Sequence, residues 1–208
     1  MNRMVSELLM LTRLQNGLST LEMRPLDLEE LLSGLVLAMQ PQAVAAGVDL
    51  RFVRSGPDTC VLADSDRLKQ AFGNLLDNAL KYTAPGGSVV LEVVGGTPRA
   101  EVIVRDTGKG IPQDDLDRVA ERFYQVDKSR SAIDGKSLGL GLAIAREVLR
   151  AHHGDMRVES REGIGTSVYV SLPSAPVQPP PLKRGGRLRL PAQSERVAGT
   201  TQETDVKA

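Results

Sequence analysis

Two valine-rich segments joined by four residues constrain the fold more than any other feature of the sequence. Residues 88–94 read SVVLEVV, residues 99–106 read RAEVIVRD, and GGTP connects them. Runs of β-branched residues bounded by Gly and Pro are typical of strands. Valines at successive positions indicate at least partial burial of both faces. The pattern therefore predicts two strands of a sheet that has little fully exposed surface.

Helical and strand patterns alternate on both sides of these segments. Asp27 can cap a helix that starts at DLEELL, and we expect Pro41 to end or kink it. Gly154 is expected to close the helix that contains residues 138–153. The other predicted elements are helices at 3–15, 65–82 and 112–123 and strands at 48–54, 60–64, 155–161 and 166–173, with a polar loop at 124–138.

The composition excludes several classes of function. Of the 208 residues 41% are hydrophobic but only 3% aromatic, which predicts an aliphatic core. Lys+Arg and Asp+Glu both number 26, so the formal net charge is zero, which argues against binding to nucleic acid or membranes through overall charge. Cys60 is the only cysteine, which excludes an internal disulfide and fits a reducing compartment. We expect a cytoplasmic chain that binds no nucleic acid and inserts into no membrane.

One predicted helix carries an unusual polar face. Residues 74–83 read NLLDNALKYT, in which Asn74 and Asn78 lie four residues apart and Lys81 and Tyr82 follow. Residues four apart project from the same side of a helix, so the two amides share one face. Because Asn is a mediocre helix former, this face is either an ordinary solvated face or a binding site.

Three glycine-containing segments follow the asparagine helix. In RDTGKGIP (105–112), Asp106 ends a strand, and Gly108 and Gly110 allow the backbone to approach a ligand. In SLGLGLAI (137–144), glycines open a helix whose free N–H groups would suit an anion. The third segment, EGIGTSVYVSLP (162–173), is a hairpin with Thr166 beside its turn. Taken singly, each is equally compatible with an ordinary turn or helix entry.

Together, the order and spacing of these segments resemble the catalytic, ATP-binding domain of sensor histidine kinases. This domain belongs to the superfamily of type II topoisomerases, heat-shock chaperone ATPases and mismatch-repair ATPases. Residues 66–83 resemble the N box, 121–131 the F box, and DTGKGI and LGLGLAI the two glycine boxes. The resemblance covers roughly residues 25–173. It implies a Bergerat-type α/β fold, a two-layer sandwich of helices on a mixed β-sheet preceded by one dimerisation helix.

The resemblance also implies a division of the chain. Residues 1–24 are similar to the second helix of the kinase dimerisation hairpin, residues 25–173 to the ATP-binding domain, and residues 174–208 have the composition of a disordered tail. We expect the phospho-accepting histidine on a hairpin in trans or upstream, because His152 and His153 fit the end of a helix. The implied partners are that hairpin, a response regulator and, in the parent kinase, a second copy. Parent kinases of this kind are commonly membrane-anchored.

Residue roles follow from the same resemblance. Asn78 is implied as the Mg²⁺ ligand for bound ATP, and Asn74 lies where ATP-hydrolysing relatives carry a glutamate base. Asp106 is implied to accept a hydrogen bond from the adenine amine. The implied catalytic residues are Asn74, Asn78 and Lys81, and the implied nucleotide contacts are Asn78, Lys81, Tyr82, Asp106, Gly108, Gly110, Arg122, Arg130, Leu138, Gly139, Leu140, Gly141 and Thr166.

Two other functions fit the sequence less well. The chain could be a degenerate binding module that dimerises through residues 3–15 or sequesters a response regulator, and exposed apolar residues on that helix would favour this reading. Gln125 stands where the family carries a basic residue, a change that would weaken a phosphate or partner contact. Alternatively, it could be an ATPase of the chaperone or topoisomerase type, although Asn74 in place of the glutamate speaks against hydrolysis. We expect the chain to bind ATP without labelling itself.

Overall fold

The computed structural model describes residues 12, 21–57, 59–125 and 139–175. Within these ranges the elements are β1 (Arg24–Asp27), α2 (Leu28–Ala46), β2 (Asp49–Arg54), β3 (Cys60–Ala63), α3 (Ser65–Tyr82), β4 (Ser88–Val94), β5 (Arg99–Asp106), the 3₁₀ helix η1 (Gln113–Asp115), α5 (Gly141–Ala151), β6 (Asp155–Arg161) and β7 (Gly165–Pro173). The predicted helix at 3–15, the tail and most of the polar loop lie outside the described residues.

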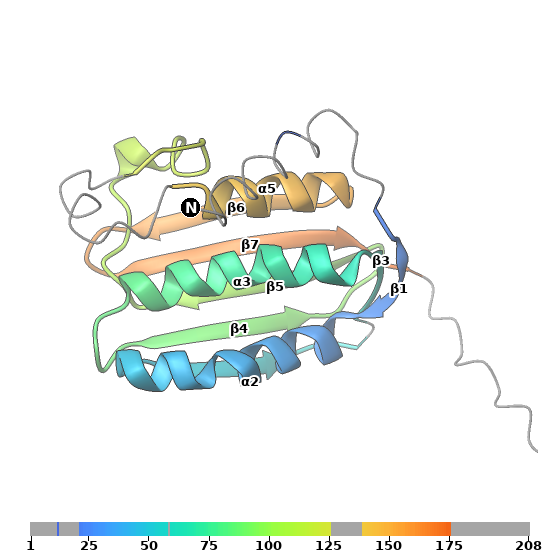
Figure 1. Cartoon of the computed structure of the whole chain (residues 1–208), viewed down its shortest axis with the longest axis horizontal. Helices are drawn as coiled ribbons and strands as arrows, with labels where there is room; N and C mark the ends of the chain where they lie inside the picture. The colour runs from blue at the N-terminus through green and yellow to red at the C-terminus, as the bar shows by residue number, and fades with distance from the viewer. Residues whose placement is uncertain (1–11, 13–20, 58, 126–138, 176–208) are drawn as a thin grey trace, which may run out of the picture. The chain divides into compact units, whose positions relative to one another are not determined.

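A mixed five-stranded sheet forms one layer and helices form the other. The strand order is β2-β4-β5-β7-β6, in which β2 runs parallel to β4 and the other neighbours are antiparallel. Helices α2, α3 and α5 lie side by side over the same face of this sheet (Figure 1). The predicted fold class, a two-layer arrangement of helices on a mixed sheet, is confirmed.

The core between the layers is aliphatic, as the composition predicts. Val89, Leu91 and Val93 of β4 are buried against the helices, while their neighbours along the strand are half-buried. On the outer face, Ile103 is only 6% exposed because its register partners Glu92 and Tyr169 flank it. The expected partial burial of both strand faces is therefore confirmed, without a second layer of helices.

Helix α3 begins and ends where the sequence predicts. The Asp64 carboxylate accepts hydrogen bonds from the backbone N–H groups of Asp66 and Arg67, both 3.1 Å long. Such a cap satisfies N–H groups that have no partner inside the helix. At the other end, the Thr83 hydroxyl donates to the Ala79 carbonyl. The buried face of the helix, which includes Phe72, faces the sheet.

Helix α2 continues past Pro41, so of the two expected outcomes, an end or a kink, the end is wrong. The helix runs to Ala46, and Gly47 caps it in the left-handed conformation at φ 67°. Proline leaves the carbonyl four residues earlier, that of Leu37, without its helical partner. Because Leu37 is 73% exposed, this side of the helix faces solvent, where water can satisfy the carbonyl.

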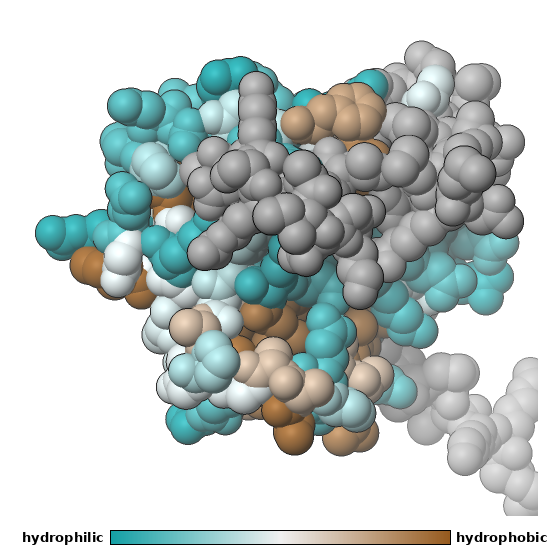
Figure 2. All heavy atoms as spheres, turned by 60° about the vertical axis from the view of Figure 1, so that its left-hand side comes forward, coloured by the Kyte–Doolittle hydropathy of each residue, from teal (hydrophilic) through white to brown (hydrophobic). Residues whose placement is uncertain are grey.

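The solvent-facing side of α2 is apolar. Val44 is 75% exposed, and no charged residue occurs between residues 31 and 48. Figure 2 shows hydrophobic side chains gathered at the bottom of the molecule, where Figure 1 places the C-terminal end of α2. None of the helices in the described part of the chain is long and apolar enough to cross a membrane.

The predicted helix at 112–123 is wrong. The structure contains only η1 and a series of turns there, and Phe123 has a φ of 61°, outside the helical range. Pro112 and the acidic residues after it give a helix start, but most helical stability in proteins comes from packing of an apolar face. Ala120 is the only residue between 112 and 123 that is buried, so such a face is missing.

Two smaller features also differ from the prediction. Strand β1 pairs antiparallel with β3 in a separate two-stranded sheet, although RPLD shows no strand pattern. At the end of α5, His153 rather than Gly154 takes the left-handed conformation, at φ 56°, and the Gly154 N–H bonds back to the Leu149 carbonyl. The glycine still closes the helix, one residue later than a typical cap.

Candidate nucleotide site

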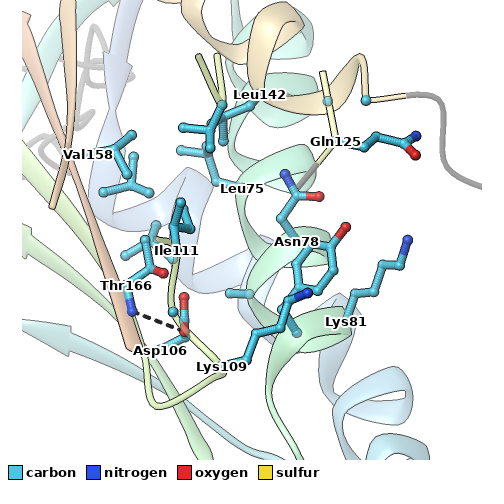
Figure 3. Close-up of a pocket in the computed structure, with 18 of the residues that line it drawn as sticks. Leu75, Asn78, Lys81, Asp106, Lys109, Ile111, Gln125, Leu142, Val158 and Thr166 are labelled. Atoms are coloured by element: carbon cyan, nitrogen blue, oxygen red, sulfur yellow. Dashed lines mark hydrogen bonds between the residues drawn. The ribbon is translucent and has the colours of Figure 1, made fainter. Parts of the chain in front are cut away.

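A cavity of about 310 Å³ lies where the C-terminal half of α3, the loop after β5 and the N-terminus of α5 meet the sheet. Its apolar walls come from α3, the strands and the loop, among them Leu75, Val104 and Val158 (Figure 3). The predicted site residues that line this cavity are Asn78, Lys81, Tyr82, Asp106, Gly110, Gly139, Gly141 and Thr166.

Asp106 presents a carboxylate at the end of β5. Its Oδ1 accepts hydrogen bonds from the backbone N–H groups of Gly108 (2.9 Å) and Thr166 (3.2 Å), the second of which is drawn in Figure 3. Burial raises the pKa of Asp106 above its ordinary value of 3.8, and the two N–H groups oppose this rise. No described residue donates a hydrogen bond to Oδ2, so this oxygen can accept one from a ligand.

The loop after β5 follows a path that requires glycines. Gly110 has a φ of 69°, and a Cβ added to it would overlap the Arg161 carbonyl oxygen of the β6–β7 hairpin. A Cβ on Gly108 would come within 2.5 Å of the Tyr82 carbonyl oxygen. The loop is therefore held between the end of α3 and the hairpin, and side chains at these two positions would separate the three segments.

Asn78 and Asn74 face the start of α5. A Cβ on Gly141 would lie 3.6 Å from Asn78 Nδ2 and 3.7 Å from Asn74 Cβ, so the glycine keeps the helix entry close to both amides. Asn74 Nδ2 is buried and has no hydrogen-bond partner among the described residues. A buried polar atom without a partner is rare and calls for a bound group or water to satisfy it.

The N-terminus of α5 carries no side-chain cap. Leu140 precedes the helix, and within the described part of the chain no side chain accepts a hydrogen bond from its first N–H groups. Gly139, at φ 69°, packs closely against the Tyr124 carbonyl oxygen. The free N–H groups and the helix dipole make such an end a site for anions. Leu140 is 2% exposed and its side chain belongs to the core, so only its backbone can contact a ligand in the cavity.

Lysines lie on two sides of Tyr82. Lys81 Nζ is 5.2 Å and Lys109 Nζ is 5.1 Å from the centre of the Tyr82 ring, and both lysines line the cavity. Lys109 is not among the predicted site residues, although it stands between the two glycines of DTGKGI. Its charge and position in that loop were the signal that could have identified it.

Among the predicted site residues that the structure describes, Asn74, Gly108, Leu140 and Arg122 do not line the cavity. Arg122 is exposed and does not line the cavity, while Arg130 and Leu138 lie outside the described residues. Tyr124 and Gln125 line the cavity from the F-box segment, and only Gln125 was noted from the sequence. The Tyr124 hydroxyl donates to Asp115, which raises the pKa of Tyr124.

His152 has a structural environment, as its place in the sequence predicts. It is 2% exposed, its Nε2 accepts from the Asp64 N–H, and its Nδ1 bonds to the Val148 carbonyl. Burial lowers the pKa of His152 below its ordinary value of 6.5. A neutral, buried imidazole with both nitrogens engaged cannot reach a phosphoryl group.

The donor groups in the cavity fit a cation held mainly by its ligand. The described residues contain no cluster of three His, Cys, Asp or Glu side chains that could hold a metal by themselves. Asn78 offers one neutral amide oxygen at the cavity wall. Mg²⁺ commonly takes one or two protein ligands and completes its shell with phosphate oxygens and water, so this donor set fits Mg²⁺ together with a polyphosphate.

Known proteins are similar to this chain in sequence and in fold. The family model described as histidine kinase-, DNA gyrase B-, and HSP90-like ATPase matches residues 63–176. Sensor protein kinase WalK of Staphylococcus epidermidis is 33% identical over 177 residues, which are 83% of this chain and 28% of that protein. Sensor histidine kinase RppB of Synechocystis sp. is 34% identical over 173 residues, 83% of this chain and 38% of that protein.

A solved structure is similar to this chain in fold as well as in sequence. Full-length ShkA, in complex with AMPPNP, superposes with a TM-score of 0.71 and 31% identity over 82% of this chain and 35% of that one. The chain thus spans well under half the length of these relatives. The chain belongs to the family of histidine kinase-, DNA gyrase B- and HSP90-like ATPases, and its described part is the ATP-binding catalytic domain of a sensor histidine kinase.

Proposed function

We propose that this domain binds Mg²⁺–ATP in the cavity and transfers the γ-phosphoryl group to a histidine of a dimerisation hairpin. The observation that carries the proposal is the placement of Asp106, Asn78 and the uncapped start of α5 around a single cavity. A carboxylate acceptor, an amide ligand and an anion site are the groups that adenine, a metal and phosphates require.

The adenine ring would occupy the end of the cavity near Asp106. Oδ2 would accept a hydrogen bond from the exocyclic amine, and the backbone around Gly108, Gly110 and Thr166 would define that end. The apolar walls, which include Ile111 and Val158, suit a flat aromatic base. A base that presents a carbonyl instead of an amine at this position would repel the carboxylate.

The phosphates would lie between α3 and the N-terminus of α5. Lys81 and the first N–H groups of α5, next to Gly139 and Gly141, would bind phosphate oxygens, and Asn78 would bind the metal. Mg²⁺ would neutralise charge that develops on the phosphate oxygens during transfer. Arg122, Arg130, Leu138 and the Leu140 backbone remain proposed contacts that would complete the phosphate end.

Asn74 would favour transfer over hydrolysis. It lies beside Gly141 at the phosphate end, and its buried Nδ2 finds no hydrogen-bond partner in the part of the chain that the structure describes. An amide can orient a neighbouring group but cannot remove a proton from water. A site without a base at this position would keep ATP until a histidine is presented.

The acceptor and partners are proposed from family membership. His152 is buried, and His153 follows the C-terminal end of α5, whereas the cavity lies at the other end of this 11-residue helix, about 16 Å away. We propose that the acceptor histidine belongs to a hairpin in trans or upstream and that the phosphoryl group then passes to a response regulator. The parent kinase would dimerise, with residues 1–24 contributing to the hairpin, 25–173 binding ATP in the cytoplasm, and 174–208 forming a tail.

Calorimetric titration of ATP with and without Mg²⁺ tests the proposal. We expect a roughly micromolar Kd that requires Mg²⁺ and is lost in Asn78→Ala and Asp106→Ala, while Asp117→Ala, an exposed carboxylate outside the cavity, binds normally. Absence of binding by the folded wild-type chain would refute the proposal.

A labelling experiment tests the proposed transfer of the γ-phosphoryl group to a histidine. With γ-labelled ATP the chain alone should remain unlabelled, and addition of a histidine-bearing dimerisation hairpin should produce an acid-labile phosphoryl label on that hairpin. Acid-labile label on the chain alone would show that one of its own two histidines is the acceptor.

A further inference from the structure

Lys109 occupies a rigid position at the edge of the cavity. Its N–H donates to the Tyr82 carbonyl (3.1 Å), and its carbonyl accepts from the Gly163 N–H (2.7 Å). The first bond ties the loop to the end of α3 and the second ties it to the β6–β7 hairpin. With both peptide groups bonded, the backbone fixes the point from which the lysine side chain starts.

The side chain extends along the cavity rather than away from it. In Figure 3, Lys109 runs from the loop beside Asp106 in the direction of Asn78. Its Nζ is 5.1 Å from the centre of the Tyr82 ring, and Lys81 Nζ is 5.2 Å from the same point. Tyr82 thus brings together two ammonium groups that originate from different segments of the chain.

The charges around the cavity are unequal. Among the described residues that line it, Asp106 is the only anion, and Lys81 and Lys109 are the only cations. A polyanion bound in the cavity that both lysines line would interact favourably with both ammonium groups, which form strong hydrogen bonds with phosphate oxygens.

We propose that Lys109 is a second phosphate-binding cation of this site, which binds the polyphosphate of the nucleotide together with Lys81. The inference rests on the proposed function, since it needs ATP in the cavity. It assigns to the loop after β5 a role beyond the shaping of the adenine end. Binding energy from Lys109 depends on phosphate charge, so it discriminates ATP from adenosine.

Titrations of ATP and adenosine into the wild type and Lys109→Gln test this role. Because Lys109 is exposed, we expect a loss of ATP affinity of about three- to fivefold, unchanged adenosine affinity, and a weaker dependence of ATP affinity on salt. Lys109→Arg should restore much of the ATP affinity. Lys69→Gln is the matched control, because Lys69 is exposed on α3 and does not line the cavity.

The outcomes separate the two proposals. If the wild type binds ATP and Lys109→Gln binds it equally well, the role of Lys109 is refuted and the proposed function stands. Equal losses for ATP and adenosine would also refute it, because they would indicate a distorted loop. If the wild type binds no ATP at all, the proposed function fails first.

Discussion

The backbone N–H of Asp64 donates a 3.0 Å hydrogen bond to Nε2 of His152, a residue 88 positions later. The bond connects the start of α3 to the end of α5. The other ring nitrogen, Nδ1, lies 2.7 Å from the Val148 carbonyl oxygen, so the neutral ring carries its proton on Nδ1. Protonation of Nε2 would place a donor against the Asp64 N–H and break this connection.

The stability of the domain should therefore fall in mild acid. Burial lowers the pKa of His152 below 6.5, although the Asp64 carboxylate opposes this and His153 reinforces it. The unfolded chain then binds a proton that the folded chain does not, so the free energy of unfolding decreases as pH falls below about 6.5, by at most about 1.4 kcal/mol per pH unit. Urea unfolding at several pH values measures this slope. His152→Gln should flatten it and His153→Gln should retain it; equal slopes in both variants would contradict the assignment.

Asp106→Asn should weaken nucleotide binding while the fold is retained. The substitution keeps the size of the side chain but removes the charge, and hydrogen bonds to charged groups contribute about 1.5–3 kcal/mol. We expect a 10- to 100-fold increase in the Kd for ATP by calorimetry, with an unchanged circular dichroism spectrum. Wild-type affinity in this variant would mean that the base is recognised elsewhere.

Two glycines with similar backbone angles should respond differently to alanine. Gly110 has a φ of 69° and Gly163 a φ of 76°, so both substitutions carry the backbone cost of about 1 kcal/mol. Only at Gly110 would the new Cβ overlap a carbonyl oxygen, that of Arg161, whereas the space beside Gly163 is open. Thermal unfolding should therefore show a clearly lower Tm for Gly110→Ala than for Gly163→Ala. Equal Tm values would show that the loop and the hairpin can separate without cost.

Leu32 and Leu37 belong to the same apolar run of the sequence but should differ in their contribution to stability. Leu32 is fully buried, so Leu32→Ala should lower the free energy of unfolding by about 2–5 kcal/mol. Leu37 is 73% exposed, so Leu37→Ala should change it by less than about 0.5 kcal/mol. Denaturant unfolding of both variants measures the difference. A large cost for Leu37→Ala in the isolated chain would indicate that its exposed face is covered.

Local signals explain which elements could be predicted. Helix α3 has a capping carboxylate at Asp64 and a regular apolar face, and the flanks of β4 and β5 contain Gly and Pro, so the bounds of these elements were predicted correctly. The bounds of β1 depend on pairing with β3, more than 30 residues later, which no local pattern contains. The predicted helix at 112–123 had a good start but no apolar surface to bury.

The residues of the site also divide into those with a signal in the sequence and those that depend on long-range packing. Motif residues such as Asn78 and Asp106 could be predicted from their order along the chain, and the structure brings them to one cavity. Wall residues such as Val104 and Val158 could not, because a core valine that faces a cavity has the same sequence pattern as one that faces another side chain. Lys109 had a signal in the sequence, its charge between two glycines, but its relation to Lys81 through Tyr82 could be found only in the structure.

The bond between Asp106 and Thr166 has a consequence for how the domain acquires activity. The two residues are register partners at the end of the β5–β7 pair. A slip of one residue in β7 would turn Thr166 to the opposite face of the sheet. Since β7 is the last strand described, the ribosome must complete nearly the whole domain before this pairing can form. ATP binding therefore requires the correct register between β5 and β7. A chain in which only β7 is misaligned would be well structured but unable to bind ATP.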